Sequence, residues 1–368
     1  MKQALLVLFC FVVYCHAEAP KGMTTFFSTE QCPPSWSELG TTKGRLILSV
    51  IQPSEGGRTL GNPLSAAEAP THTHPYSVSV TIPEKEISAD SCCDDQGACK
   101  GTYVVKNQTQ DYTSGVPFTQ LKLCTLNTTN SEISVPFGTV AYFDPSVQQC
   151  PTNWTLFSES DGRFLVPGWE VKGTTTSDAP ALSYGADIVH SHNISSTDNT
   201  LSIADVSYAG IAGCCNDNMG ESGTVPFTGS ADPESANIPY IQMLTCISQE
   251  KTVTATNLPT SANLFNTVGC PEGWAVDLTV AGRFLVSLPT SAVAGAAFGG
   301  DSMPAHYTGP AGVHSHDFQG NFDTDDCGIG LVSGCCADGY ARDQSYSFKG
   351  VTDSGNVNVP YVSLPFCS

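Results

Sequence analysis

The sequence predicts an all-β protein of three tandem domains, each stapled by disulfides and folded like a β-sandwich or a β-barrel. Its apolar runs are short, rich in Val, Ile, Phe, Tyr and Thr, and bounded by Gly, Pro, Asn or Asp, as strands are. No window carries a convincing helical stripe of apolar residues. One ordered set of motifs also occurs three times along the chain, which indicates a repeated unit.

The composition excludes several classes of protein. Charged residues make up 14% of the 368 residues, and 34 Gly and 24 Pro argue against coiled coils and long helices. The net charge of -20 argues against binding to nucleic acid or to an anionic membrane surface. Hydrophobic residues reach 40%, which is enough to bury several small cores, so general disorder is not expected either.

Residues 1–17 are expected to be a secretory signal peptide. An apolar run over residues 4–14 follows Lys2 and leads to Cys15 and Ala17, the small residues that signal peptidase requires. No later stretch approaches the roughly 20 apolar residues of a membrane helix, so we expect a secreted, extracellular protein without membrane insertion. Four glycosylation sequons agree with that route: Asn107, Asn127, Asn153 and Asn193.

The repeat begins with Cys-Pro-x-x-Trp, which starts at Cys32, Cys150 and Cys270, at spacings of 118 and 120 residues. A Gly-Arg pair before an apolar strand, a His-x-His pair, a vicinal Cys pair and a closing strand then follow. The closing strand starts with Pro and an aromatic residue, and a Cys stands seven residues after the Pro. We therefore expect repeat domains over residues 18–134, 135–256 and 257–368.

Twelve cysteines, four in each repeat, are expected to form structural disulfides in an oxidising compartment. Neighbouring cysteines rarely bond to each other because the ring is strained. We therefore expect one vicinal Cys to hold the opening Cys and the other to hold the closing Cys, in either of two patterns. The twelve are Cys32, Cys92, Cys93, Cys124, Cys150, Cys214, Cys215, Cys246, Cys270, Cys335, Cys336 and Cys367.

Cys99 in the first repeat and Cys327 in the third have no counterpart in the other repeats. They can join within the chain, which requires the first and third domains to touch. Alternatively, each bridges to a neighbouring chain, which would build a head-to-tail polymer.

Three His-x-His pairs are candidates for a metal site. Residues two apart on a strand point to the same face, so each pair offers two imidazoles from one side. Two nitrogens are too few for a closed site, but three converging repeats, or three chains, could supply six. The alternative is that each pair hydrogen-bonds to backbone and packs structurally. The six residues are His72, His74, His190, His192, His314 and His316.

Two further sets of polar residues recur. Arg45, Arg163 and Arg283 are expected to fork onto a carboxylate or a carbonyl and lock a turn. An Asp follows each vicinal Cys pair, and more acids lie nearby in the third repeat, so calcium is an alternative ligand although the EF-hand spacing is absent. These acids are Asp95, Asp217, Asp338, Asp323, Asp325 and Asp326.

The sequence lacks the patterns of common catalytic sites. It contains no Gly-x-Ser-x-Gly elbow, no phosphate-binding Gly-rich loop and no His-Glu-x-x-His. We therefore expect that the protein is not an enzyme.

The second repeat contains Pro136-x-Gly138-Thr, an aromatic pair, Cys150-Pro-x-x-Trp, Gly162-Arg-Phe and His190-x-His. This order of motifs resembles the bacteriophage tail-collar domain, whose pattern runs Pro-x-Gly-Thr, an aromatic, Pro-x-Gly-Trp, Gly-Arg-Phe and His-x-His. The first and third repeats match it in part, over roughly the first half of each repeat. Collar proteins are fibre and adhesin parts, often trimeric, and some hold a metal between chains through His-x-His. The resemblance thus implies that the six histidines are metal ligands.

The leading functional expectation is a secreted, glycosylated structural protein. Repetition and dense disulfides suit an extracellular fibre or surface coat that assembles head to tail from copies of the chain. The alternative is a glycan- or receptor-binding adhesin module that acts as a monomer or trimer. Trp36, Trp154 and Trp274 recur in the repeat framework and are expected in the core, whereas Trp169 is unique.

Overall fold

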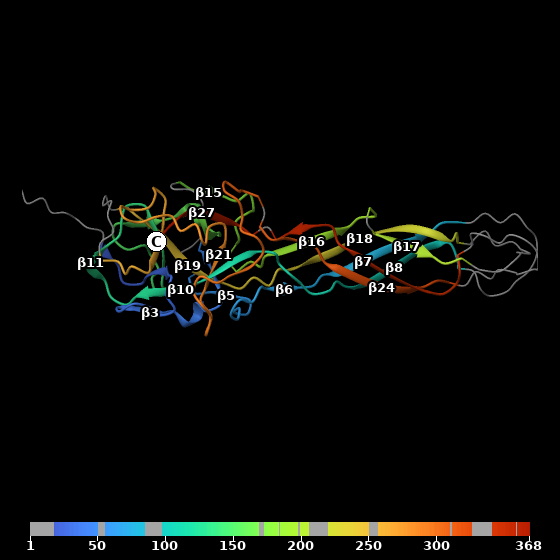
Figure 1. The fold of residues 1–368 in the computed structure, drawn as a ribbon, viewed down its shortest axis with the longest axis horizontal. Helices are drawn as coiled ribbons and strands as arrows, with labels where there is room; N and C mark the ends of the chain where they lie inside the picture. The colour runs from blue at the N-terminus through green and yellow to red at the C-terminus, as the bar shows by residue number, and fades with distance from the viewer. Residues whose placement is uncertain are drawn as a thin grey trace, which may run out of the picture.

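The computed structural model describes residues 18–50, 56–84, 98–168, 173–183, 185–197, 199–205, 220–249, 257–309, 311–325, 341–357 and 359–368. In this part of the chain the regular elements are strands, apart from two short 3-10 turns, η1 (Gly40–Thr42) and η3 (Ser158–Ser160). The predicted all-β class is confirmed. None of these residues forms a helix that could cross a membrane. The molecule is elongated, with a broad head at one end and a narrower stem at the other (Figure 1).

The head contains three sets of three strands, one strand of each set from each repeat. The first set is β2 (Met23–Phe27), β12 (Thr139–Phe143) and β20 (Ala262–Asn266), which pair with one another. The second set follows the Gly-Arg motifs and is β4 (Leu46–Ser49), β14 (Phe164–Gly168) and β21 (Phe284–Ser287). The third set is the closing strands, β10 (Pro117–Leu126), β19 (Tyr240–Ser248) and β27 (Tyr361–Cys367).

Each closing strand connects two repeats. It runs parallel to the Gly-Arg strand of another repeat: β10 beside β21, β19 beside β4, and β27 beside β14. Its far end is antiparallel to the strand of the first set that belongs to its own repeat. The ladder therefore closes on itself as a β-barrel to which all three repeats contribute.

Short strands line the outside of the head. They are β1 (Glu18–Ala19) with β11 (Asn130–Ser134), β3 (Trp36–Glu38) and β22 (Ala297–Gly299) on β10, β5 (Thr59–Leu60) and β13 (Trp154–Leu156) on β19, and β15 (Thr175–Thr176) on β27.

The stem is built from β7 (Pro75–Ile82), β8 (Gly101–Gln108), β16 (Val189–Ile194), β17 (Thr200–Ile203), β18 (Gly223–Ser235), β24 (Asp317–Asp323) and β25 (Ser345–Val351). Buried and exposed residues alternate along β7 and β24, as expected for strands with one face toward a core. At the far end of the stem, three backbone N–H groups donate around a ring, from Ala98 to Ala341, from Ala341 to Gly220 and from Gly220 to Ala98, each at 2.9 Å. The three repeats thus meet again beyond the head.

All three repeats contribute to each hydrophobic cluster of the described chain. In the head, Phe284 of the third repeat packs edge-on against Phe164 of the second, with ring centroids 6.0 Å apart. In the stem, Phe227 and Phe318 from two repeats pack with Tyr76 from the remaining one. The prediction of three tandem domains is therefore not confirmed. The repeats are units of sequence, but they share sheets and cores because each closing strand finds its hydrogen-bond partner in another repeat.

The framework tryptophans lie where the repeat predicts. Trp36 and Trp154 are buried, and Trp274 is half-buried against the same cluster. Trp169 lies outside the described residues.

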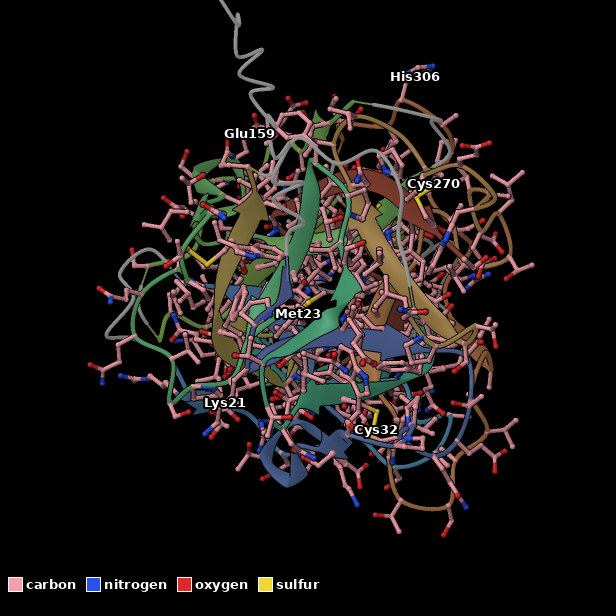
Figure 2. The ribbon with its side chains drawn as sticks, turned by 90° about the vertical axis from the view of Figure 1, so that its left-hand side faces the viewer. Lys21, Met23, Cys32, Glu159, Cys270 and His306 are labelled. Carbon is pink, nitrogen blue, oxygen red and sulfur yellow. A yellow bond between two sulfur atoms is a disulfide. The ribbon has the colours of Figure 1, made fainter. Side chains whose placement is uncertain are left out.

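The disulfides differ from the expected pattern. The opening Cys of each repeat bonds directly to the closing Cys, as Cys32–Cys124, Cys150–Cys246 and Cys270–Cys367. In the first repeat β3 pairs with the end of β10, and this register brings the two Cα atoms to 5.8 Å, within bonding range. The expectation that the vicinal cysteines hold these two was wrong. Seen end-on, the head has Met23 near its centre and Cys32 and Cys270 toward its rim (Figure 2). The vicinal cysteines Cys92, Cys93, Cys214, Cys215, Cys335 and Cys336 lie outside the described residues.

Cys99 is disulfide-bonded within the single chain, and the other six described cysteines pair among themselves. Its N–H donates to the carbonyl of Asp325 at 2.8 Å, so the first and third repeats do touch. A covalent polymer through Cys99 therefore lacks support. Cys327 lies outside the described residues.

The shared core predicts one cooperative unfolding transition. Ile241 on β19 is fully buried in a cluster built from all three repeats. Ile241→Val should lower the free energy of unfolding of the whole chain by about 1 kcal/mol. Differential scanning calorimetry checks this, with Leu156→Ala as the control because Leu156 is exposed in the same repeat. Three separable transitions, with only one shifted by Ile241→Val, would contradict a shared core.

Candidate metal centre

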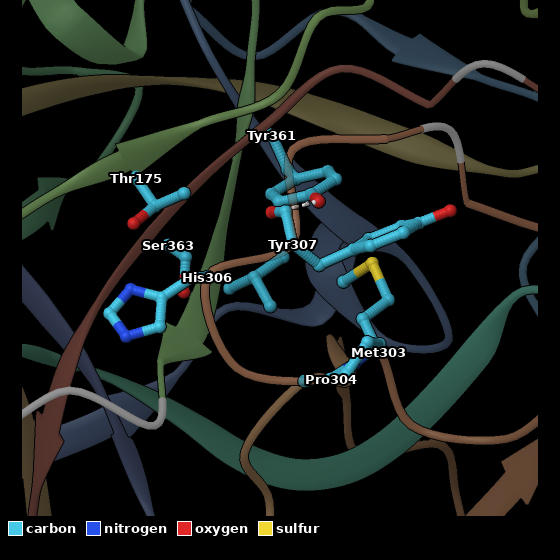
Figure 3. Close-up of a pocket in the computed structure, with 9 residues that line it drawn as sticks. Thr175, Met303, Pro304, His306, Tyr307, Tyr361 and Ser363 are labelled. Carbon is cyan, nitrogen blue, oxygen red and sulfur yellow. Dashed lines mark hydrogen bonds between the residues drawn. The ribbon is translucent and has the colours of Figure 1, made fainter.

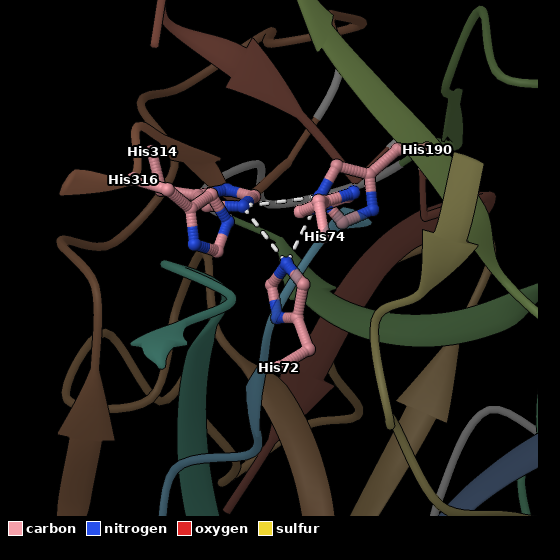
Figure 4. A group of neighbouring side chains, drawn as sticks. All are labelled: His72, His74, His190, His314 and His316. Carbon is pink, nitrogen blue, oxygen red and sulfur yellow. Dashed lines mark hydrogen bonds between the residues drawn. The ribbon is translucent and has the colours of Figure 1, made fainter. Parts of the chain in front are cut away.

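The three His-x-His pairs converge in the neck, which is the segment between head and stem. His72 ends β6 (Thr71–His72), His190 and His192 lie on β16, and His314 ends β23 (Val313–His314). The strand β6 pairs with β9 (Tyr112–Thr113), and β23 pairs with β26 (Gly355–Asn356). Buried and exposed residues alternate along β16, so both of its histidines face inward. The histidines of the other two pairs are buried as well, and Figure 4 shows five of the six rings, all but that of His192, gathered from three sides.

The first histidines of the three pairs form a triangle, whose centre lies on the axis around which the three repeats are arranged. The Nε2 atom of His72 lies 3.1 Å from that of His190 and 3.1 Å from that of His314, and the Nε2 atoms of His190 and His314 are 3.0 Å apart. The second histidines of the three pairs, His74, His192 and His316, form a second layer behind this triangle. The two layers are close, since His74 Nε2 lies 3.3 Å from His190 Nε2.

Backbone carbonyls set the orientation of the second-layer rings. The Nδ1 atoms of His74, His192 and His316 lie 2.8, 3.0 and 3.2 Å from the carbonyl oxygens of Asp232, Asp353 and Gln110. His314 Nδ1 is likewise 2.9 Å from the Gly312 carbonyl. A carbonyl oxygen only accepts, so Nδ1 carries the proton and donates. In the neutral ring Nε2 then presents a lone pair toward the axis, as a metal ligand requires.

All six rings are buried, with no more than 7% of any residue exposed. Burial, together with the charges of the neighbouring histidines, lowers the pKa of His72 to about 3 and that of His190 to about 2. Burial is also the main cause that lowers the pKa of His192 and of His316 to about 4, and it lowers the pKa of His314. These five rings are therefore neutral at physiological pH and free to bind a cation.

The spacing of the nitrogens matches one face of an octahedron. Two nitrogens about 2.1 Å from a metal ion and at right angles to each other are about 3.0 Å apart, whereas a tetrahedral site would separate them by about 3.4 Å. The observed triangle has edges of 3.0 to 3.1 Å. The ligand atoms of five of the histidines lie within 4.8 Å of one another, and the ring of the sixth, His192, contacts those of His74, His314 and His316.

Ring-to-ring hydrogen bonding alone does not satisfy this cluster. His192 Nε2 and His316 Nε2 are buried without a hydrogen-bond partner. In the triangle, His314 Nε2 presents a lone pair. The Nε2 atoms of His72 and His190 can each carry at most one N–H, which can point to only one of the other two nitrogens. Lone pairs that face each other in a dry site cost free energy, and a cation at the centre would remove that cost.

Two threonines support the second layer, and motif reading missed them. Thr109 Oγ1 accepts the N–H of His74, and Thr352 Oγ1 accepts the N–H of His316, both at 2.9 Å. The signal in the sequence is a Thr at the same place in repeats one and three, 35 and 36 residues after the second histidine. Isolated threonines are common, so their role depends on the fold.

The repeated arginines hold turns in the head. Arg45 Nη1 donates to the carbonyls of Leu60 and Gly61, and Arg163 Nη1 donates to those of Ser177 and Ala179. In the third repeat Arg283 Nη1 donates to the Gly300 carbonyl.

Gly162 shows why a glycine stands before each Arg. Its φ is 64°, and its N–H donates to the carbonyl of Ser49 in the first repeat. A Cβ at Gly162 would lie 2.4 Å from the carbonyl oxygen of Leu182, so only glycine fits.

Two of the acids predicted as calcium ligands lie in the described part of the chain. Asp323 and Asp325 are exposed and belong to no cluster of metal-binding side chains in the described chain. Asp95, Asp217, Asp326 and Asp338 lie outside the described residues. The four sequon asparagines are exposed, Asn107 and Asn193 on the stem and Asn127 and Asn153 on the head.

One small pocket in the head is lined by Thr175, Met303, His306, Tyr307 and Tyr361, among others (Figure 3). Its cavity volume is about 20 Å³. That is enough for one or two water molecules and too little for an organic substrate.

Comparison with known proteins finds no family model, no curated protein and no solved structure that matches this chain.

Proposed function

We propose that this protein is a secreted structural spike, in which three repeats of one chain fold around a common axis and a divalent metal ion bound by six histidines ties them together. One observation carries the proposal: a buried triangle of Nε2 atoms on the axis, one from each repeat, with edges of 3.0 to 3.1 Å. Because every repeat supplies two imidazoles, the ion would cross-link all three repeats at the neck.

The ligand chemistry favours a first-row transition metal. Imidazole suits Fe, Ni, Cu and Zn, whereas Ca²⁺ and Mg²⁺ prefer oxygen ligands, which the cluster lacks among its described residues. Structural zinc is almost always four-coordinate, and copper(II) prefers tetragonal geometry. A triangle of three nitrogens at octahedral spacing, with three more imidazoles behind it, therefore favours Fe²⁺, Co²⁺ or Ni²⁺.

The role we assign to the ion is structural. Catalytic metal sites keep an open position for water or substrate, and six protein ligands leave none. Bound to the native state alone, the ion adds its binding free energy to the stability of the fold.

The three-fold arrangement is already complete within one chain, so the metal site needs no second copy. This favours the adhesin version of the function, in which a single chain presents its stem to a receptor or glycan, over a head-to-tail fibre. The resemblance to tail-collar domains supports both versions, since collar proteins are parts of fibres and adhesins.

Elemental analysis of the protein secreted from eukaryotic cells tests the metal. We expect about one first-row transition metal ion per chain, and a ratio near zero would overturn the proposal. Negative-stain imaging and a glycan array then separate the two versions of the function. Separate elongated particles that bind one class of glycan support the spike, whereas filaments support the fibre.

A further inference from the structure

A polar groove runs along the stem between the edge strand β8 and the β24–β25 hairpin, which pack against each other. Its volume is about 500 Å³, within the range of ligand sites. The residues that line it include Asn107, Gln319, Asn321, Ser347, Phe348 and Lys349.

The register of the hairpin explains why the groove is polar. Gln319 lies opposite Lys349 and Asn321 lies opposite Ser347, so two cross-strand pairs stand side by side. All four side chains face solvent, because the alternate residues of both strands are buried in the stem core. They offer amide, hydroxyl and ammonium groups, which together donate and accept hydrogen bonds.

Asn107 stands at the edge of this groove in a fixed orientation. Its Oδ1 accepts the N–H of Gln108 at 2.9 Å, and its side chain is also hydrogen-bonded to the Tyr76 hydroxyl. The buried Tyr76 is anchored in turn, because its hydroxyl donates to the Gln319 carbonyl at 2.6 Å. These hydrogen bonds therefore hold the side chain of Asn107, the first residue of a sequon, in one orientation.

We propose that Asn107 carries an N-linked glycan whose first sugars lie in this groove, held by the outward side chains of β24 and β25. In the modification, the bond from Asn107 Nδ2 to sugar C1 forms as the bond from C1 to the diphosphate of a lipid-linked oligosaccharide breaks, and Nδ2 loses one proton. The remaining N–H can still donate to Tyr76. Sugar hydroxyls both donate and accept, which matches the groups that line the groove. The inference rests on the secretion that the proposed function assumes.

Glycopeptide mass spectrometry of the protein secreted from eukaryotic cells gives the occupancy of each sequon. The rate of glycan release by a peptide:N-glycosidase, measured site by site on the folded protein, then tests docking. We expect release from Asn107 to be about tenfold slower than from Asn193, the exposed sequon elsewhere on the stem, because one or two net hydrogen bonds must break first. The triple variant Asn321→Ala, Ser347→Ala, Lys349→Ala should bring the two rates together.

These substitutions are on the surface, so the variant should fold, and an unchanged metal content will verify it. If the triple variant is not secreted, Lys349→Ala alone provides the same comparison with a smaller expected change. An unmodified Asn107 beside occupied sequons elsewhere overturns the inference, as does release from Asn107 as fast as from Asn193. Neither result affects the metal-bound spike. If all four sequons are unmodified, the assumed secretory route fails instead.

Discussion

Replacing His190 with leucine is expected to abolish stoichiometric metal binding and to lower the unfolding temperature by about 10 °C. His190 is the best substitution because its Nε2 lies within 3.3 Å of those of three other histidines, His72, His74 and His314. A metal present at about 1,000 times its dissociation constant adds about 4 kcal/mol to stability, and that increment is lost with the ion. Elemental analysis and thermal unfolding of the secreted protein measure the two effects.

The matched control is His306→Ala. His306 is the remaining histidine of the described chain; it is exposed and lies outside the cluster. This variant should keep its metal and its unfolding temperature within about 2 °C, because surface substitutions change stability by less than about 0.5 kcal/mol. A structural role without metal makes a different prediction. In that case the wild-type protein would hold no ion. The difference in stability between the wild type and His190→Leu would then be the same whether or not a chelator is present during folding.

Acidification is expected to destabilise the protein steeply between pH 6.5 and pH 5. Four cluster histidines have a pKa of about 2 to 4 in the folded state, against 6.5 for the ordinary side chain. A folded pKa that lies below the unfolded one means that the unfolded chain binds more protons below pH 6.5. Stability is therefore complete above that pH and falls as the pH drops toward the folded values. Each ring contributes a slope approaching about 1.4 kcal/mol per pH unit. Protons also compete with a bound metal for the same nitrogens, which acts in the same direction.

Denaturant titrations at pH 7.5, 6.5, 5.5 and 5.0 test this dependence. The window ends above the pH at which most carboxylates take up protons, so the slope reports on histidine. His72→Leu, His190→Leu and His314→Leu combined should make the profile shallower, because His192 and His316 remain, while His306→Ala should leave it as steep as in the wild type. If the unfolding free energy of the wild type is constant across this range, the rings are not buried in neutral form and the geometry of the cluster is wrong.

The pattern of the chain was enough to predict several features. Short apolar runs bounded by Gly and Pro predicted an all-β protein, because such runs are too short for helices and their ends favour turns. The spacing of two in His72 and His74 predicted that both rings face the same side. The repetition of the pair predicted that six nitrogens could meet. These inferences depend on local periodicity, which a sequence carries directly.

The sequence left other features open or led to the wrong answer. Cys32 and Cys124 are 92 residues apart, and their bond depends on how β3 pairs with β10, a register that no local pattern encodes. The supporting bonds of Thr109 and Thr352 likewise depend on strands that meet only in the folded stem.

The sequence by itself determined that this protein contains one unit three times and what each unit offers: strands, a Gly-Arg turn and a pair of imidazoles. Only the tertiary structure decided that the units interlock. A strand has two edges that need partners, and nothing in its own residues says whether a partner comes from the same repeat or the next. In this chain the closing strands pair with both, and that choice closes the barrel and brings the histidines onto one axis.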